Sequence, residues 1–536
     1  MGALTLKNFP FELRGWDIEK FDSIDPTDGF GSNTRIYISK NQIISIEPDY
    51  NTSTFNLWLT DKGRQFFDGI FGAAKNKDKK IKSNFWRNLF KTVNETIYIL
   101  THCNQLNYKK KFVVIIFGNG SLEVLNILLL IAQKYSFIKL KRIENFISEN
   151  DLEYNFQLNA ASTDTKLSYS SICFLISSNT RYEGSCLNLN LRQRFLKGNF
   201  KCFVLGSFTD LTFPIIFLGS TTKILKSISE GNNLNCQDFK TAENLTVIYN
   251  DELFKRSDNK TVLNMLKNFD YSNEFNYVWS GLNMLNSSLF ESGNNTLCKF
   301  IPFTFKDLNC SNFLYFVNVT FNNSSNLKII TELNLLNFNN LLATKPFQGL
   351  VVDQSYEKNI NYNFNHKINI NDDFSYYKFV PVSTFYENEE TFLNTEGLFK
   401  KTIKLISKKK TKNSWQILKK FLKNLNKSFN FNVNQNDGRI IFKSKKTVDF
   451  KNFTNFHYYA IQNLTNLNFY LTKKTKPVIF YKKYKIFKLV DSKFKITKLK
   501  YWLDDFFILG RDDYSQNSSV LANCSKILRL ESTNFF

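Results

Sequence analysis

Polar and apolar residues alternate through the amino-terminal part of the chain. The alternation is clearest over residues 35–38 and 42–46, and turn-forming residues lie at 28–29 and 31–33. A period of two places successive side chains on opposite faces, which is the pattern of a half-buried strand. The sequence therefore predicts short antiparallel strands and hairpins in a small β-rich region over residues 1–70.

Continuous apolar runs and helical spacing replace this pattern further along the chain. Residues 112–117 suit a strand buried on both faces, and Ser121 and Glu123 open a helix behind it. A second unit consists of a strand at 172–176, a polar loop at 177–182, a helix at 187–196 and a strand at 202–205. Strand, helix and strand at this spacing predict a right-handed crossover between parallel strands.

Further segments continue the alternation, namely a helix at 84–100 and the segments 221–230, 245–249, 262–269 and 313–319. Repeated alternation of this kind predicts an α/β fold with doubly wound parallel sheets over residues 71–430. Short strands at 350–353 and 379–382 and a basic helix at 415–425 complete this region.

Residues 431–536 form a basic, aromatic-rich carboxyl-terminal extension, in which lysines alternate with aromatic residues, for example over 481–487. Such a segment can bind single-stranded nucleic acid, because rings stack on bases while ammonium groups follow phosphates. It can equally be an edge strand that lysines protect from aggregation. No zinc finger or aromatic RNA-recognition signature supports nucleic-acid binding.

Composition indicates a folded chain of two to four domains, since 43% of its 536 residues are hydrophobic. Lys and Arg together number 71 against 47 Asp and Glu, a net charge of +24, which favours an anionic partner. The 56 Phe and 24 Tyr against 20 Gly and 8 Pro indicate another source, an AT-rich genome whose codons favour Phe, Lys, Asn and Tyr.

The eight cysteines are widely spaced and include no C-x-x-C run, and the histidines are only His102, His366 and His457. Structural zinc and iron–sulfur sites usually draw several thiolates from short runs, so the sequence predicts neither. We also expect no signal peptide and no targeting presequence at the amino terminus. Apolar runs fall short of the roughly 20 residues that cross a bilayer, so no transmembrane segment is expected.

Two segments at strand ends are candidates for chemistry. Gly118 and Gly120 form half of a dinucleotide-binding fingerprint, but Glu123 stands at the third glycine position and would repel a pyrophosphate. A tight strand-to-helix turn is therefore expected there. Residues 177–183 follow a buried strand, where Arg181 can grip an anion or form an internal ion pair with Glu183, and we expect the pair.

Three groups of segments resemble one family. The first is residues 14–17, 23–33, 58–64 and 67–69, the second is 179–183 with 205–212 and 218–220, and the third is 385–387 with 392–397. Together they resemble the carboxyl-terminal, molybdopterin-oxidoreductase-like part of the 75 kDa iron–sulfur subunit of respiratory complex I. The resemblance runs discontinuously from about residue 11 to about residue 398, and residues after about 430 carry none.

This resemblance implies a molybdopterin-oxidoreductase-like fold that serves as a structural scaffold in the matrix arm of mitochondrial NADH:ubiquinone oxidoreductase. It implies that this chain binds no cofactor and has no catalytic residue, while FMN and iron–sulfur clusters lie on partner subunits. No cysteine precedes Cys103, so we expect a split subunit whose cluster-bearing amino-terminal half is a separate polypeptide. The expected location is the matrix side of the inner membrane, peripheral, with a mitochondrial gene.

The residues singled out in the three groups are expected to determine the fold rather than to react. Gly31 and Gly206 would form turns, Asp28 and Asp210 would cap or close loops, and Arg181 with Glu183 would form a buried pair. The full set of motif residues is Asp28, Gly31, Ser32, Asn33, Asn179, Arg181, Tyr182, Glu183, Gly206, Asp210, Asn394, Glu396 and Gly397.

Two other functions stay open at this point. One is a molybdopterin oxidoreductase that still binds its cofactor. The other is an organellar RNA-binding or ribosomal protein, whose binding would weaken steeply with salt.

Overall fold

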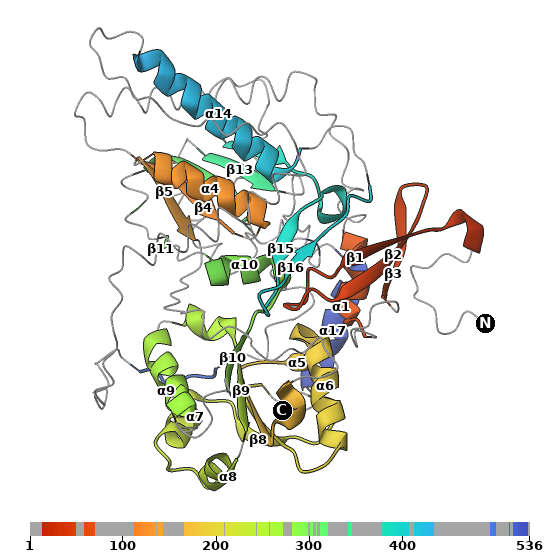
Figure 1. The fold of residues 1–536 in the computed structure, drawn as a ribbon, viewed down its shortest axis with the longest axis vertical. Helices are drawn as coiled ribbons and strands as arrows, with labels where there is room; N and C mark the ends of the chain where they lie inside the picture. The colour runs from red at the N-terminus through yellow and green to blue at the C-terminus, as the bar shows by residue number, and fades with distance from the viewer. Residues whose placement is uncertain are drawn as a thin grey trace.

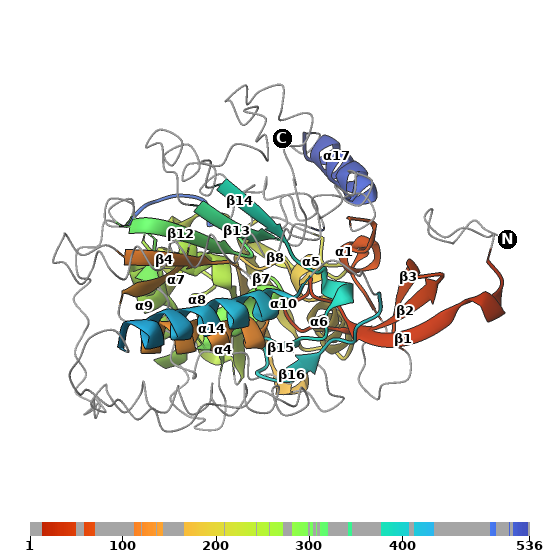
Figure 2. The same cartoon turned by 90° about the horizontal axis from the view of Figure 1, so that it is seen from above.

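The structure is a computed structural model that describes residues 13–49, 58–69, 112–142, 166–271, 281–319, 341–345, 377–406, 412–433, 494–499, 514 and 518–533, with short gaps inside some ranges. The helix expected at 84–100, the strand expected at 350–353 and the lysine–aromatic alternation at 481–487 lie outside the described residues. Figures 1 and 2 show the two parallel sheets, the small amino-terminal sheet and the helices around them.

Sheet A is the antiparallel amino-terminal sheet predicted from the alternation of residues. Its strands are β1 (Glu19–Ile24), β2 (Asn33–Ser39) and β3 (Gln42–Pro48), in that order. A 3-10 turn, η2 (Gly15–Asp17), precedes it, and a short helix, α1 (Asp61–Gln65), follows it. The inward side chains of Ile36, Ile38, Ile43 and Ile46 are buried together against Phe66 and Phe385.

Sheet B is parallel throughout and has the order β11-β5-β4-β12-β13-β14. Its strands are β4 (Phe112–Phe117), β5 (Ile138–Arg142), β11 (Ile301–Pro302), β12 (Ser311–Val317), β13 (Leu341–Lys345) and β14 (Tyr377–Pro381). Helices α4 (Leu122–Lys134) and α14 (Ser414–Val433) lie side by side against it (Figures 1 and 2). Trp415, Leu418 and Phe421 of α14 are buried in the core that α4 shares with the sheet.

Sheet C is also parallel throughout and has the order β10-β9-β6-β7-β8. Its strands are β6 (Ile172–Ile176), β7 (Lys201–Leu205), β8 (Ile216–Gly219), β9 (Leu245–Asn250) and β10 (Leu282–Leu285). The helices around it are α5 (Thr180–Glu183), α6 (Ser185–Leu196), α7 (Thr222–Ser229), α8 (Cys236–Thr241), α9 (Asn259–Tyr271) and α10 (Leu289–Leu297), with 3-10 turns η4 (Lys166–Tyr169) and η5 (Asp251–Lys255).

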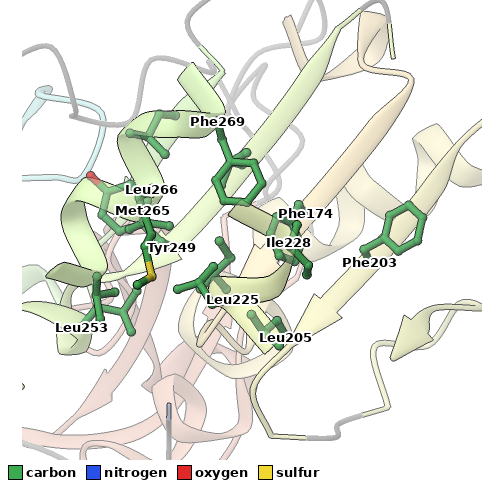
Figure 3. Close-up of a cluster of buried hydrophobic side chains, with 14 of the residues drawn as sticks. Phe174, Phe203, Leu205, Leu225, Ile228, Tyr249, Leu253, Met265, Leu266 and Phe269 are labelled. Carbon is green, nitrogen blue, oxygen red and sulfur yellow. The ribbon is translucent and has the colours of Figure 1, made fainter. Parts of the chain in front are cut away.

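Both faces of sheet C are covered, as a doubly wound sheet requires. Phe174, Phe203 and Tyr249 project to one face, where they pack against Leu225 of α7 and Leu266 of α9 (Figure 3). The alternate residues of the same strands project to the other face. There Cys173, Leu175, Cys202 and Val204 meet Leu187 and Leu191 of α6 and Phe30 from the amino-terminal segment.

The predicted fold class is confirmed. The strands predicted at 112–117 and 172–176 have the predicted bounds, and the strand predicted at 202–205 begins one residue earlier, at Lys201. One local prediction was wrong, because the loop expected over 177–182 contains the one-turn helix α5. Both large sheets are parallel, so their carboxyl ends gather polar loops at defined edges.

A final group of elements joins the amino-terminal sheet to the end of the chain. Strands β15 (Thr391–Leu393) and β16 (Phe399–Lys401) form a two-stranded sheet after the turn η6 (Phe385–Glu387). Tyr514 is buried among Phe66, Phe290 and Phe385, and its hydroxyl oxygen accepts a hydrogen bond from the Phe385 N–H at 2.7 Å. Helix α17 (Ser519–Thr533) follows, and at its start the Asp68 carboxylate accepts hydrogen bonds from the Ser518 hydroxyl and the Val520 N–H.

Tyr514→Phe tests whether the end of the chain is an integral part of this core. The substitution leaves the Phe385 N–H buried without its acceptor, which should lower the unfolding free energy by about 1–3 kcal/mol. The measurement is urea unfolding followed by circular dichroism. Tyr169→Phe, at a side chain that is 70% exposed, is the matched control and should change little. Equal unfolding midpoints for Tyr514→Phe and the wild type would contradict the placement of Tyr514 in this core.

Candidate functional site

The candidate site is the region where the carboxyl ends of sheets B and C face helix α10. Asn294 of α10 donates to the carbonyl oxygen of Gly118, directly after β4, at 2.7 Å. Asn295 donates to Asp251, directly after β9, at 3.0 Å, and accepts from Arg142 at the end of β5 at 2.7 Å. Helix α10 therefore lies between the two edges and binds both (Figure 1).

A ladder of side chains crosses the carboxyl edge of sheet C. Glu183 accepts hydrogen bonds from the Asn179 N–H at 2.9 Å and from Nδ2 of Asn250 at 2.7 Å. The hydroxyl of Ser287, after β10, donates to Asn250 and to Asp251. The ladder thus joins β6, β9 and β10 at the point where the strand order reverses, which is where open α/β sheets place ligands.

Some buried polar atoms at this edge have no hydrogen-bond partner within the described part of the chain. They are the hydroxyls of Ser177 and Ser178 and both amide atoms of Asn179. Ser177 also adopts a left-handed backbone conformation, with φ of 55°. Buried polar groups of this kind usually bind ordered water, which marks this edge of the sheet as a polar site.

The amino end of α4 forms the tight strand-to-helix turn that the sequence predicts at the glycine pair. The carboxylate of Glu123 accepts the Thr391 N–H with both oxygens, at 3.0 and 3.2 Å. A Cβ at Gly118 would lie 2.4 Å from the carbonyl oxygen of Asn318, so the turn is closed by backbone. The chain's own strand β15 therefore packs against the first turn of α4.

Glu390 lies beside Glu123 and is also buried. Burial, and then the Glu123 carboxylate, raise the pKa of Glu390 to about 8. Glu390 therefore keeps its proton at neutral pH, because an ionised Glu390 would be a buried charge close to another carboxylate.

The first and third motif groups form a second polar cluster. Asp28 closes its own loop by accepting from the Phe30 N–H at 3.0 Å and the Ser32 hydroxyl at 2.7 Å. Asn394 donates to the Phe30 carbonyl at 3.1 Å, and Lys400 donates to Asn33 at 3.1 Å. Residues more than 360 positions apart are thus joined directly.

Burial, and then the neighbouring Asp25 carboxylate, raise the pKa of Asp28 to about 7. Ser32 also lies 3.2 Å from the sulfur of Cys186, in the first turn of α6. The amino-terminal loop is therefore attached to sheet C through α6 as well as to the segment 394–400.

The expected ion pair between Arg181 and Glu183 was wrong. Arg181 is 42% exposed and binds the backbone carbonyl and carboxylate of Asp210 at 3.1 and 3.3 Å, and its guanidinium lies over the Tyr182 ring. Glu183 is buried and faces the ladder. A one-turn helix sends residues two positions apart to different sides, so the two side chains find different partners.

The remaining motif residues lie in turns. Gly31 and Gly397 have φ of 60° and 82°, in the left-handed region that favours glycine. Gly206 follows β7, and its N–H donates to the Gly219 carbonyl at 2.8 Å. Glu396 lies in the turn between β15 and β16. The structure thus brings the 28–33, 179–183 and 394–400 segments around α6 and α10.

Sequence reasoning missed much of the ladder. Asn250 and Asp251 lie at the end of a buried strand, and Ser287 follows another, which is the signal that selected residues 177–183. Applied to every strand, that signal would have found them. Asn295 has no such signal, because its importance comes from the packing of α10 between two sheets, and Arg142 ends the short strand β5, which was not predicted.

The residues at these edges do not fit a pterin dinucleotide. Glu183, Asn250 and Asp251 are bound to one another or to α10, and Arg142, the cation of the network, is bound to Asn295. Carboxylates exceed cations in the network, whereas a pyrophosphate needs positive charge or free N–H donors. The small group at Ser177, Ser178 and Asn179 keeps polar atoms without a partner among the described residues, but it carries no charge.

Comparison with known proteins identifies the class. Residues 86–424 match the family described as molybdopterin oxidoreductase, and residues 18–68 match "NADH-ubiquinone oxidoreductase NDSU1/NuoG-like, 4Fe-4S domain". The first match covers more than half of the chain, so the chain belongs to the molybdopterin oxidoreductase family.

The relatives give the particular branch. The chain is 26% identical over 315 residues to the NADH-ubiquinone oxidoreductase 75 kDa subunit of Reclinomonas americana, covering 55% of this chain and 44% of that protein. It is 27% identical to a NADH-quinone oxidoreductase subunit from Rickettsia prowazekii, covering 56% and 45%. It is 23% identical to the 75 kDa subunit of Acanthamoeba castellanii, covering 100% and 70%. The chain spans less than half the length of the first two relatives, and the predicted resemblance is confirmed.

The match to a 4Fe-4S domain raises the question of whether residues 18–68 fit a cluster. That segment contains no cysteine, and its strands are filled by isoleucines and hydrogen-bonded polar residues. Among the described residues no group of three His, Cys, Asp or Glu side chains is arranged to hold a metal ion. The segment therefore matches the domain in sequence without the thiolates that a cluster requires.

The Glu123–Glu390 pair predicts a pH dependence of stability. The folded chain holds the Glu390 proton up to about pH 8, whereas the unfolded chain releases it near 4.5. Between these values the unfolding free energy should fall as pH rises, by about 1.4 kcal/mol per pH unit for this group. Glu390→Gln cannot ionise and should remove that share of the slope.

The measurement is the urea midpoint of wild type and Glu390→Gln at several values between pH 4.5 and 8. Glu389→Gln is the matched control, because Glu389 is adjacent in sequence but more exposed and paired with Lys401. A slope that Glu390→Gln leaves unchanged would refute the raised pKa of Glu390.

Proposed function

We propose that the chain is a scaffold subunit of the matrix arm of mitochondrial complex I. It supports electron transfer from NADH to ubiquinone, which FMN and iron–sulfur clusters on neighbouring chains carry out. The observation that carries the proposal is the filled edge between sheets B and C, where a member of the molybdopterin oxidoreductase family holds its own α10. Its relatives are named as subunits of NADH-ubiquinone and NADH-quinone oxidoreductases.

We further propose that the clusters lie on partner subunits, including a separate polypeptide that corresponds to the cluster-binding half of the relatives. Residues 18–68 of this chain match the 4Fe-4S domain but contain no cysteine, and this supports the division. In this arrangement sheet A would present a cluster-bearing partner to the body of the chain. The partner-facing region would then be residues 1–70, the α/β body residues 71–430, and the extension residues 431–536.

The proposed location is the matrix side of the mitochondrial inner membrane, as a peripheral subunit. Mitochondrial relatives support it. Within the described part of the chain, no helix combines the length and apolar character needed to span a bilayer. The AT-rich composition supports a mitochondrial gene.

A substitution at the junction of the amino-terminal loop tests the scaffold role. A Cβ at Gly29 would lie 2.1 Å from the Asn286 carbonyl oxygen and 2.8 Å from the Thr395 hydroxyl, so Gly29→Ala should loosen this junction. We expect less assembled complex, while NADH oxidation per assembled FMN stays unchanged. The readout is native electrophoresis with in-gel NADH oxidation, calibrated by FMN fluorescence.

Gly15→Ala is the matched control, because nothing lies within 4 Å of a Cβ at that position. A normal amount of complex with lower activity per FMN would indicate a catalytic part and count against the scaffold role. Migration of the chain with ribosomes, or stoichiometric molybdenum in the purified chain, would favour the RNA-binding protein or the cofactor-binding oxidoreductase.

The division into two polypeptides has its own test. Mass spectrometry of the denatured complex should assign the cysteine ligands of the clusters to a polypeptide distinct from the one that contains residues 13–69. Peptides linking a cluster-binding segment covalently to this chain would disprove the division while leaving the scaffold role intact.

A further inference from the structure

Two cysteines face each other on neighbouring strands in the centre of sheet C. Cys173 of β6 pairs with Cys202 of β7 in the parallel ladder, and Thr246 of β9 is the partner of Cys173 on its other side. Paired residues of a ladder project to the same face. Both cysteines accordingly belong to the core beneath α6, which contains Leu187 and Leu191.

The strand spacing suits a bond between the two thiols. Adjacent strands lie about 4.8 Å apart, and disulfides span Cα separations of roughly 4.4–6.8 Å. The Cβ atoms of a disulfide are closer, at about 3.8 Å, so bond formation must draw the two strands together. A bond formed under such strain is more easily reduced than a relaxed one, which makes the modification reversible.

Both thiols are free and closed off from solvent, with exposures of 0% and 2%. Burial, and then the neighbouring Cys202, raise the pKa of Cys173 well above its usual range. An oxidant can therefore reach the two thiols only when α6 moves away from the sheet. Asn188 holds that helix, because it accepts from the Thr180 hydroxyl at 2.9 Å and donates to the Leu211 carbonyl at 3.0 Å.

Other described cysteines lack this arrangement. Cys186 and Cys236 lie in helices α6 and α8, and Cys524 lies in α17 with an intermediate exposure. None of the three stands opposite a cysteine in the described strand ladders. The register of the sheet, which places Cys173 opposite Cys202, therefore distinguishes this pair from the other described cysteines.

We propose that Cys173 and Cys202 form a reversible dithiol–disulfide pair that a hydroperoxide oxidises when α6 opens. One thiolate attacks a peroxide oxygen, the O–O bond breaks, and a sulfenic acid forms as hydroxide leaves and is protonated to water. The second sulfur attacks the sulfenic sulfur, the S–O bond breaks, and a second water leaves. Two thiols lose two electrons and one hydrogen peroxide is reduced to two waters. Excess dithiol reverses the bond by exchange.

The closed bond would tighten β6 against β7 directly beneath α6. The same strand β6 leads into Asn179, and α5 with Glu183 precedes α6. The redox state of the pair would therefore act on the strand that supports the ladder between β6, β9 and β10. This inference does not depend on the proposed scaffold function.

The experiment treats the purified full chain with hydrogen peroxide, blocks remaining thiols with iodoacetamide and digests it with trypsin without reduction. A linked pair of peptides, residues 167–181 and 202–223, should appear and should vanish after dithiothreitol. Cys173→Ser and Cys202→Ser should each abolish it, while Cys236→Ser should leave it. Tryptophan fluorescence before treatment confirms that each variant is folded.

Asn188→Ala makes the test specific for opening of α6. Loss of its two hydrogen bonds should speed linkage by roughly tenfold, because local opening becomes easier. Peroxide exposure that oxidises the more exposed Cys524 without linking the two peptides would overturn the proposal. So would linkage of Cys173 to another cysteine, or a linkage rate that Asn188→Ala leaves unchanged.

Discussion

The side chain of Asn295 is the single contact on which the relation between the two parallel sheets most depends. Its amide nitrogen donates to Asp251 and Asn286, and its amide oxygen accepts from Arg142. An amide offers two donor hydrogens and an acceptor oxygen in one small side chain, whereas a carboxylate cannot donate to Asp251 and an ammonium group cannot accept from Arg142. One neutral residue thus lies between Asp251, at the carboxyl end of sheet C, and Arg142, at the carboxyl end of sheet B, and is hydrogen-bonded to both.

The same kind of contact makes the edge between the sheets an integral part of the fold. Parallel strands bring their polar ends to one side, where many proteins of this architecture bind ligands. Here Glu183, Asp251 and Glu123 accept hydrogen bonds from the chain's own amides and backbone. These bound carboxylates make the edge a junction between α10, β15 and the two sheets.

The sequence predicts what depends on local composition and misses what depends on distant partners. Strands β4 and β6 are uninterrupted apolar runs, so their bounds follow from the sequence alone. Strand β10 was missed, because it has four residues and contains Asn283, which is buried through a hydrogen bond to Gly281. The resemblance placed Asp28 and Asn394 in one set, but only the fold shows that Asn394 binds the loop of Asp28 through Phe30. Arg181 and Glu183 do not form the expected ion pair, because Glu183 accepts a hydrogen bond from Asn250, 67 residues away in the chain.

Polar junctions of this kind suit a part that must hold others in position. Apolar packing alone tolerates exchange of similar side chains and small slips between surfaces, whereas a satisfied buried polar network accepts one arrangement. The amino-terminal sheet, the segment 385–401 and Tyr514 share one core, and the loop of Asp28 ties that core to α6. A partner bound to sheet A would therefore keep a defined orientation to sheet C, because directional hydrogen bonds as well as apolar contacts connect the two sheets.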